Sequence, residues 1–175
     1  MADIIHKELS YLVNGCIFDV HNELGPGLRE ECYQKAMEIR LAQAGIPFVS
    51  KPRTRHELIY LGETADVFEP DFLVSEWMAL ELKVQREGLT TANFRQTVNY
   101  VKHWKFSLGL LVNFADAQAV IRRVIFHEVA VEPDQDFEAI RDLVTLELRP
   151  DLKEIRDVIL AAHRDFGLGY SDTTY

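Results

Sequence analysis

The chain has little cysteine. Its two cysteines, Cys16 and Cys32, form no CxxC pair, so the sequence indicates neither a disulfide framework nor a zinc site. No apolar run is long enough to cross a bilayer, and the N-terminus lacks the basic start and apolar stretch of a signal peptide. These absences favour a cytoplasmic protein with no membrane partner.

Positive charge is also scarce, with 19 Lys and Arg against 28 Asp and Glu and a net charge of −9. The deficit is uneven. Residues 1–127 hold 14 basic against 16 acidic side chains, whereas residues 128–175 hold 5 against 12. An acidic total argues against a strong nonspecific grip on nucleic acid, although a local basic patch could still serve.

The remaining composition is that of a globular protein, with 175 residues, 47% of them hydrophobic and 27% charged. We expect one main domain over residues 1–127. Residues 128–175 are expected to form an acidic helical extension.

The stretch from Pro70 to Lys83 predicts a β-hairpin. Two short apolar runs, residues 72–74 and 78–82, flank a polar Ser75-Glu76. In the second run every other side chain is a large apolar one, and this alternation leaves Glu81 and Lys83 together on the opposite face.

This hairpin predicts a cation site. With a turn at residues 75–77, antiparallel pairing sets Asp71 opposite Glu81, and two facing carboxylates repel each other. A divalent cation between them turns the repulsion into attraction, and hard oxygen ligands suit Mg²⁺ or Mn²⁺. Lys83 projects from the same face and could hold or activate a water there. The alternative is an ordinary solvated hairpin face with mixed charges.

The N-terminal part predicts two helices. Apolar residues recur at three- and four-residue steps over residues 4–24, and Gly25-Pro26-Gly27 ends that pattern. A second helix is expected over residues 30–44.

Residues 48–60 are expected to be extended and to start a three-stranded meander that ends at Lys83. In this segment Lys51, Arg53 and Arg55 alternate, so a strand would place them on one face. That face is either a solvated sheet edge or a stripe that contacts phosphates.

Further along, Thr90 or Thr91 could cap a helix over residues 92–104, on which Gln96 and Tyr100 share a face. Residues 105–113 and 119–126 predict two more strands, the first of them buried. The resulting order is helix, helix, three strands, helix, strand, strand, which predicts an α/β fold with a mixed sheet.

Three short stretches of the sequence resemble the motifs of one known family. The matches are Gly27-Leu28-Arg29-Glu30-Glu31-Cys32-Tyr33 to G-x-x-E-x-x-Y, Pro70-Asp71 with Glu81-Leu82-Lys83 to PD-(D/E)XK, and Gln96 with Tyr100 to Q-x-x-x-Y. Over residues 8–126 the chain therefore resembles the GxxExxY proteins of the PD-(D/E)XK nuclease superfamily.

This resemblance implies a restriction-endonuclease-like αβββαβ core with a mixed central sheet, here followed by a C-terminal helical extension. It also implies Mg²⁺-dependent (or Mn²⁺-dependent) hydrolysis of phosphodiester bonds. The expected partner is nucleic acid, DNA in preference to RNA. No recognition domain appears, so sequence-specific cleavage is not indicated.

The resemblance also implies roles for single residues. Asp71 and Glu81 would bind the metal, aided by the carbonyl of Leu82, and Lys83 would orient the attacking water. Glu30 would be a further ligand or a water holder.

Two residues of the later helix receive open assignments from the same resemblance. Gln96 would position the water, the Lys83 side chain or the phosphate. Tyr100 would support its helix or stack near the substrate. A non-catalytic module that binds nucleic acid or protein on the same fold is the alternative to the enzyme.

The tail predicts two helices, residues 134–148 and 152–166, and it ends in a repeat. Residues 159–175 align with residues 17–33 at an offset of 142, with an identical Ile, His, two Gly and Tyr. Either two helix endings match by coincidence, or the tail is the start of a degenerate or truncated second copy of the family unit. Such a copy could pack on another subunit, which makes a homo-oligomer through the extension possible.

Overall fold

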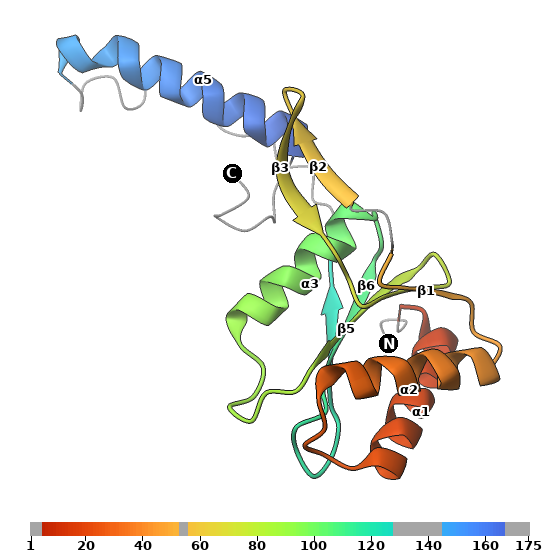
Figure 1. The fold of residues 1–175 in the computed structure, drawn as a ribbon. Helices are drawn as coiled ribbons and strands as arrows, with labels where there is room; N and C mark the ends of the chain where they lie inside the picture. The colour runs from red at the N-terminus through yellow and green to blue at the C-terminus, as the bar shows by residue number, and fades with distance from the viewer. Residues whose placement is uncertain (1–4, 53–55, 128–144, 167–175) are drawn as a thin grey trace.

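The structure is a computed structural model that describes residues 5–52, 56–127 and 145–166. Its helices are α1 (Lys7–Leu24), α2 (Glu30–Gln43), α3 (Thr91–His103) and α5 (Arg149–Phe166), with a 3-10 turn η1 (Leu146–Leu148). Its strands are β1 (Phe48–Ser50), β2 (His56–Tyr60), β3 (Glu63–Phe68), β4 (Phe72–Val74), β5 (Met78–Lys83), β6 (Leu108–Asn113) and β7 (Val120–Ile125). Figure 1 shows their arrangement.

The central sheet has five strands in the order β1-β4-β5-β6-β7. Strand β5 pairs with β6 in parallel, and the other three pairings are antiparallel. The parallel pair is joined by the crossover helix α3, as parallel neighbours require. The structure thus confirms the predicted α/β class with a mixed sheet and a C-terminal helix.

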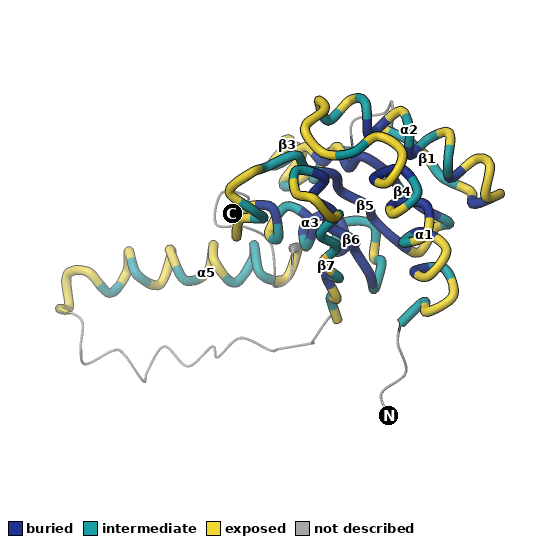
Figure 2. The backbone as a smooth tube through the Cα atoms, turned by 90° about the horizontal axis from the view of Figure 1, so that it is seen from below, coloured by how far each residue is buried: buried dark blue, intermediate teal, exposed yellow. Residues whose placement is uncertain are grey.

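Helices cover both faces of this sheet, with α1 and α2 on one side and α3 on the other (Figure 1). The larger core joins α1 and α2 to the inward side chains of the sheet, among them Leu80 and Leu82. The smaller core packs Tyr100 and Val101 of α3 on Ala79. The strand β5 is therefore buried on both faces (Figure 2), which is typical of a central strand with a parallel neighbour.

The helix ends follow the predicted signals. Gly25 takes a positive φ of 67° directly after α1, and its N–H donates to the carbonyl of His21 at 2.8 Å. At the start of α3, Thr90 Oγ1 accepts from the N–H of Asn93, and Asn93 Oδ1 accepts from the N–H of Thr90. This reciprocal capping box fixes where the helix begins.

The predicted strand over residues 48–60 is wrong in its continuity. Strand β1 ends at Ser50, because Lys51 adopts a left-handed φ of 37° that no strand accommodates. The segment then divides: β1 pairs with β4, whereas β2 pairs only with β3 in a separate two-stranded hairpin. The predicted meander is therefore interrupted: β1, β4 and β5 are antiparallel neighbours up to Lys83, but the β2–β3 hairpin is inserted between β1 and β4.

The C-terminal extension is described from residue 145. The helix predicted over residues 134–148 lies mostly outside the described residues, and so does the end of the repeat, residues 167–175. Helix α5 begins three residues earlier than predicted and includes Pro150, which the first turn of a helix tolerates. Figure 1 shows α5 beyond the β2–β3 hairpin, away from the sheet. Among the described residues, no helix is long and apolar enough to cross a membrane.

Candidate active site

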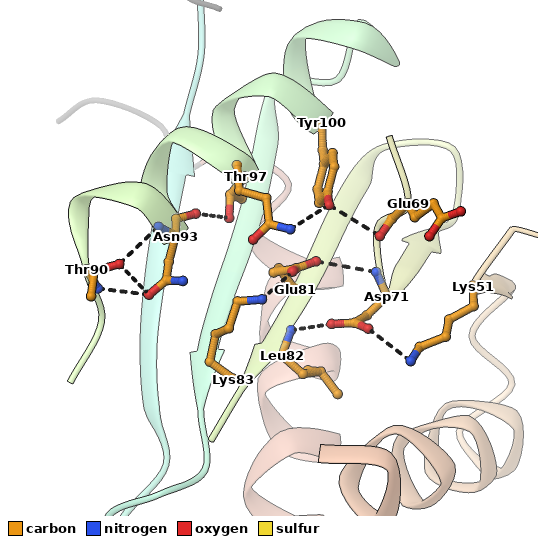
Figure 3. A network of polar contacts seen from close by, with 11 residues as sticks. Lys51, Glu69, Asp71, Glu81, Leu82, Lys83, Thr90, Asn93, Thr97 and Tyr100 are labelled. Carbon is orange, nitrogen blue, oxygen red and sulfur yellow. Dashed lines mark hydrogen bonds and ion pairs between the residues drawn. The ribbon is translucent and has the colours of Figure 1, made fainter. Parts of the chain in front are cut away.

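The β4–β5 hairpin brings Asp71 and Glu81 together. Its register pairs Leu73 with Ala79 and Phe72 with Leu80, which confirms the predicted pairing and sets Asp71 across from Glu81. The N–H of Asp71 donates to Glu81 Oε2 at 3.4 Å, and the N–H of Leu82 donates to Asp71 Oδ2 at 2.8 Å. Figure 3 shows both carboxylates in one polar network.

Both carboxylates lie almost entirely out of water, with Asp71 6% and Glu81 3% exposed. Burial, followed by the nearby charge of Asp71, raises the pKa of Glu81 to about 7. Burial likewise raises the pKa of Asp71, although the N–H of Leu82 opposes that shift. The pair is therefore short of positive charge, a condition that a bound cation relieves.

Lys83 supplies part of that charge. Its Nζ lies 2.7 Å from Glu81 Oε1, and its side chain is 14% exposed. Burial alone lowers the pKa of Lys83, but the attraction of Glu81, Glu30 and Asp71 raises it overall. The residue is thus a fixed cation beside the two carboxylates, on the same face of β5 as Glu81.

Lys51 approaches Asp71 from the loop after β1. Its Nζ lies 3.9 Å from Asp71 Oδ1, while more than half of its side chain is exposed. Its main-chain N–H donates to the carbonyl of Asp71 at 2.9 Å. Lys51 therefore reaches the site from a bend and not from a strand face, and Arg53 and Arg55 lie outside the described residues.

Glu30 is the first residue of α2 and is half-buried. Burial and then the charge of Asp71 raise its pKa, and Lys83 opposes this shift. In the part of the chain that the structure describes, no three His, Cys, Asp or Glu side chains form a group suited to hold a metal. Glu30 therefore lies within the electric field of the pair without joining it in one carboxylate cluster.

The motif that contains Glu30 also has a structural part. Tyr33 is fully buried, stacks on Phe114 at 4.4 Å between ring centroids, and donates its hydroxyl to the carbonyl of Gly25 at 2.5 Å. This bond ties the loop between α1 and α2 to the core. It thereby fixes the start of α2, where Glu30 lies.

Helix α3 closes the other side of the site. Gln96 Nε2 donates to Tyr100 Oη at 2.8 Å, and Tyr100 Oη donates to the carbonyl of Glu69 at 3.2 Å. Tyr100 is 4% exposed, and burial, followed by the charge of Glu81, raises its pKa. This burial favours the supporting role among the two that we expected for Tyr100.

The sequence analysis missed Gln34, which is buried. Its Nε2 donates to Ser50 Oγ at 2.9 Å and to the carbonyl of Asp71 at 3.1 Å, and Ser50 in turn donates to Glu38. The available signal was a polar side chain beside Tyr33 on a helix face that is otherwise buried. Asn113 was missed as well, and it accepts from and donates to the main chain of Gln85, two residues after the end of β5.

The donor set suits a hard divalent cation. The paired carboxylates of Asp71 and Glu81 offer oxygen ligands, which Mg²⁺ and Mn²⁺ prefer over nitrogen or sulfur. The raised pKa of both carboxyl groups fits the same reading, because the protein itself leaves their charge incompletely balanced.

A comparison with protein families found one match. Residues 7–124, more than half of the chain, match the model described as the PD-(D/E)XK nuclease superfamily. The curated proteins and the solved structures contain no match to the chain. This match shows the superfamily, and the resemblance to its GxxExxY group stays a prediction from the motifs.

Proposed function

The chain belongs to the PD-(D/E)XK nuclease superfamily, and from this premise we propose that it is a metal-dependent nuclease that hydrolyses phosphodiester bonds of nucleic acid. DNA is the expected substrate in preference to RNA, without sequence specificity. The observation that carries the proposal is the buried pair of Asp71 and Glu81 with Lys83 Nζ 2.7 Å from Glu81.

The pair is costly to the protein without a ligand. Facing carboxylates inside a protein destabilise it unless a cation or a proton compensates them. A plain structural domain has no need of this arrangement, and a passive binding surface would place its charges in water. A metal-dependent hydrolase could use such a pair to hold its cation.

In the proposed site Asp71, Glu81 and the Leu82 carbonyl hold Mg²⁺ or Mn²⁺. When bound, the metal would neutralise phosphate charge and acidify a water. Glu30 would hold a water from the α2 side, since its half-buried carboxyl group is close enough to be influenced by the charges of Asp71 and Lys83.

Lys83 would donate a hydrogen bond to the attacking water and stabilise the charge that develops on the phosphate. It is pre-oriented for this by its bond to Glu81 Oε1. Gln96 would position the water, the Lys83 side chain or the phosphate from α3. Lys51, whose side chain is more than half exposed, would leave its contact with Asp71 and pair with a substrate phosphate. Arg53 and Arg55 would contact further phosphates of the substrate.

The test is cleavage of a panel of single-stranded, duplex and flapped DNA and of RNA under Mg²⁺, Mn²⁺ and EDTA. Lys83→Ala and Glu81→Ala are expected to abolish cutting, whereas Lys7→Ala, which removes an exposed lysine of α1, leaves it unchanged. Calorimetric titration with Mn²⁺ runs alongside. A folded wild-type protein that binds no metal would contradict the nuclease and leave the non-catalytic binding module on the same fold.

A further inference from the structure

One oxygen of the buried carboxylate pair lacks a close hydrogen-bond donor. Asp71 Oδ2 accepts from the N–H of Leu82 at 2.8 Å. Glu81 Oε1 accepts from Lys83 Nζ at 2.7 Å, and Glu81 Oε2 accepts from the N–H of Asp71 at 3.4 Å. The fourth oxygen, Asp71 Oδ1, lies 3.9 Å from Lys51 Nζ, too far for a hydrogen bond, and no closer donor is found among the residues that the structure describes. Of the four, Oδ1 is therefore the oxygen most open to a new ligand.

Two lysines approach the pair from opposite sides (Figure 3). Lys83 is 14% exposed and bonded to Glu81. The side chain of Lys51 is 57% exposed and has the longer contact, with Asp71. An ion pair that is this long and this exposed is weak. Lys83 is thus a fixed cation of the site, and Lys51 is an exchangeable one.

The main chain of Lys51 is anchored beside Asp71 independently of its ammonium group. Its N–H donates to the carbonyl of Asp71 at 2.9 Å, and its φ of 37° is left-handed, a conformation that costs energy in a residue with a side chain. The four-carbon stem beyond it is flexible and carries three donors at its tip. The ammonium group can therefore move while the base of the residue stays in place.

The charge of Lys51 acts on the acidic groups of the site. Burial raises the pKa of Asp71 and of Glu30, and Lys51 is among the charges that oppose both shifts. A divalent cation at Asp71 Oδ1 would supply the same compensation and would repel the ammonium group. Cation binding at Asp71 and release of Lys51 are therefore linked.

We propose that Lys51 couples metal binding to substrate binding, by pairing with Asp71 in the metal-free protein and with a phosphate of the substrate once a cation is bound. This inference rests on the proposed nuclease function. Without a cation, Asp71 holds the ammonium group and repels the phosphate, so the protein binds nucleic acid weakly. With a cation at Asp71, Lys51 gains a phosphate contact. Because such coupling is reciprocal, nucleic acid also raises the affinity of the site for the cation by the same factor.

The coupling can be tested without any metal, by neutralising Asp71. Asp71→Asn keeps an oxygen that can accept from the N–H of Leu82 and removes the charge that holds Lys51. In EDTA we expect this variant to bind a fluorescent DNA duplex at least about fivefold more tightly than the unaltered protein. Adding Lys51→Met should remove most of that gain, whereas Lys51→Met alone should change the affinity by less than about twofold.

The salt dependence of binding identifies the contact that is gained. In the Asp71→Asn protein, Lys51→Met should reduce the slope of log affinity against log salt concentration by about 0.9, the value for one phosphate contact on duplex DNA. In the protein that retains Asp71, the same substitution should leave the slope unchanged. Lys51→Arg keeps the positive charge and should preserve both the gain and the slope in the Asp71→Asn protein.

The matched control is Glu81→Gln, which removes a negative charge from the same pair but from the partner of Lys83. Its effect on DNA affinity should be the same with and without Lys51→Met. A gain from Asp71→Asn that Lys51→Met leaves intact would overturn the coupling and leave the nuclease standing. If none of these proteins bound DNA or RNA, the proposed function would fail together with this inference.

Discussion

Gln34 Nε2 lies 3.1 Å from the main-chain oxygen of Asp71, which also accepts from the N–H of Lys51. A side chain of α2 therefore fixes the main chain of a candidate metal ligand at the start of β4. Because Gln34 bonds Ser50 as well, one amide connects helix α2, strand β1 and the site.

Replacement of Gln34 by alanine is expected to weaken metal binding and cleavage by about tenfold or more, as loss of an outer positioning group does. Loss of the two hydrogen bonds that Gln34 donates, to the Asp71 carbonyl and the Ser50 hydroxyl, would also cost about 1–3 kcal/mol of stability. Calorimetry with Mn²⁺ and thermal unfolding measure the two effects. Gln43→Ala, on the exposed end of the same helix, is the matched control, and equal effects of both variants would contradict this role.

The raised pKa of Glu81 predicts how the metal-free protein responds to pH. Its folded pKa of about 7 exceeds the ordinary value of 4.5, so between these values the folded state keeps a proton that the unfolded chain has released. In EDTA, stability is therefore expected to fall as the pH rises from about 4.5 to 7.

The variant Glu81→Gln tests this expectation. Its amide stays neutral, so at pH 8 in EDTA the variant should be more stable than the wild type. The pKa difference sets an upper limit on the order of 3 kcal/mol for this gain. The gain should be smaller than this limit, because Lys83 loses its charged partner in the variant. Mg²⁺ should raise the Tm of the wild type and leave that of the variant unchanged. A variant that is less stable at pH 8 in EDTA would show that the buried charge is already compensated.

Because Gly109 in β6 has no side chain, α3 can pack closely against the sheet at this position. A Cβ at this position would lie 2.6 Å from Thr97 Cγ2 and 2.9 Å from Val101 Cγ2. Gly109→Ala is therefore expected to cost about 1–3 kcal/mol and to lower activity by shifting the helix that carries Gln96. Thr97→Ser removes the nearer methyl group and keeps the bond of its hydroxyl to Asn93. Added to Gly109→Ala, it should restore part of the Tm, and no recovery would point to another cause.

His103 predicts a loss of stability in acid. It lies among Phe68, Trp104 and His56, and burial, followed by the neighbouring His56, lowers its pKa. As the pH is lowered, His103 therefore takes up its proton at a higher pH in the unfolded chain than in the folded protein. Stability is expected to fall as the pH drops below about 6.5. Unfolding followed between pH 7 and 5 should be less pH-dependent in His103→Phe. The exposed His127→Phe should retain the slope, and an identical slope in both variants would refute the assignment.

The part of the site on the hairpin was predictable because it depends on local rules. A two-residue period and a short turn fix which side chains of β4 and β5 meet, so Asp71, Glu81 and Lys83 follow from sequence order. The G-x-x-E-x-x-Y stretch similarly placed Glu30 at a helix start.

The remaining features depend on tertiary contacts that no local pattern contains. Strand β1 leaves the segment of β2 because it pairs with β4, and the left-handed bend at Lys51 then turns its side chain toward Asp71. In the sequence Gln34 is one more polar residue of a helix, and its role follows only from its bonds to Ser50 of β1 and to Asp71 before β4. A helix pattern can mark such a residue as buried, but its hydrogen-bond partners can be named only once the sheet order is known.

Strand β5 carries core side chains and the side chains proposed for catalysis on alternate residues, so two kinds of genetic change are expected to have different consequences. A point substitution at Glu81 or Lys83 would leave a folded chain without its chemistry, and an enzyme lineage could become a binding module in one step. A single-residue insertion or deletion in the turn at residues 75–77 would instead exchange Leu82 for Glu81 against the core. That change removes fold and activity together, so the length of this turn is expected to vary less than the identity of the residues that it brings into register.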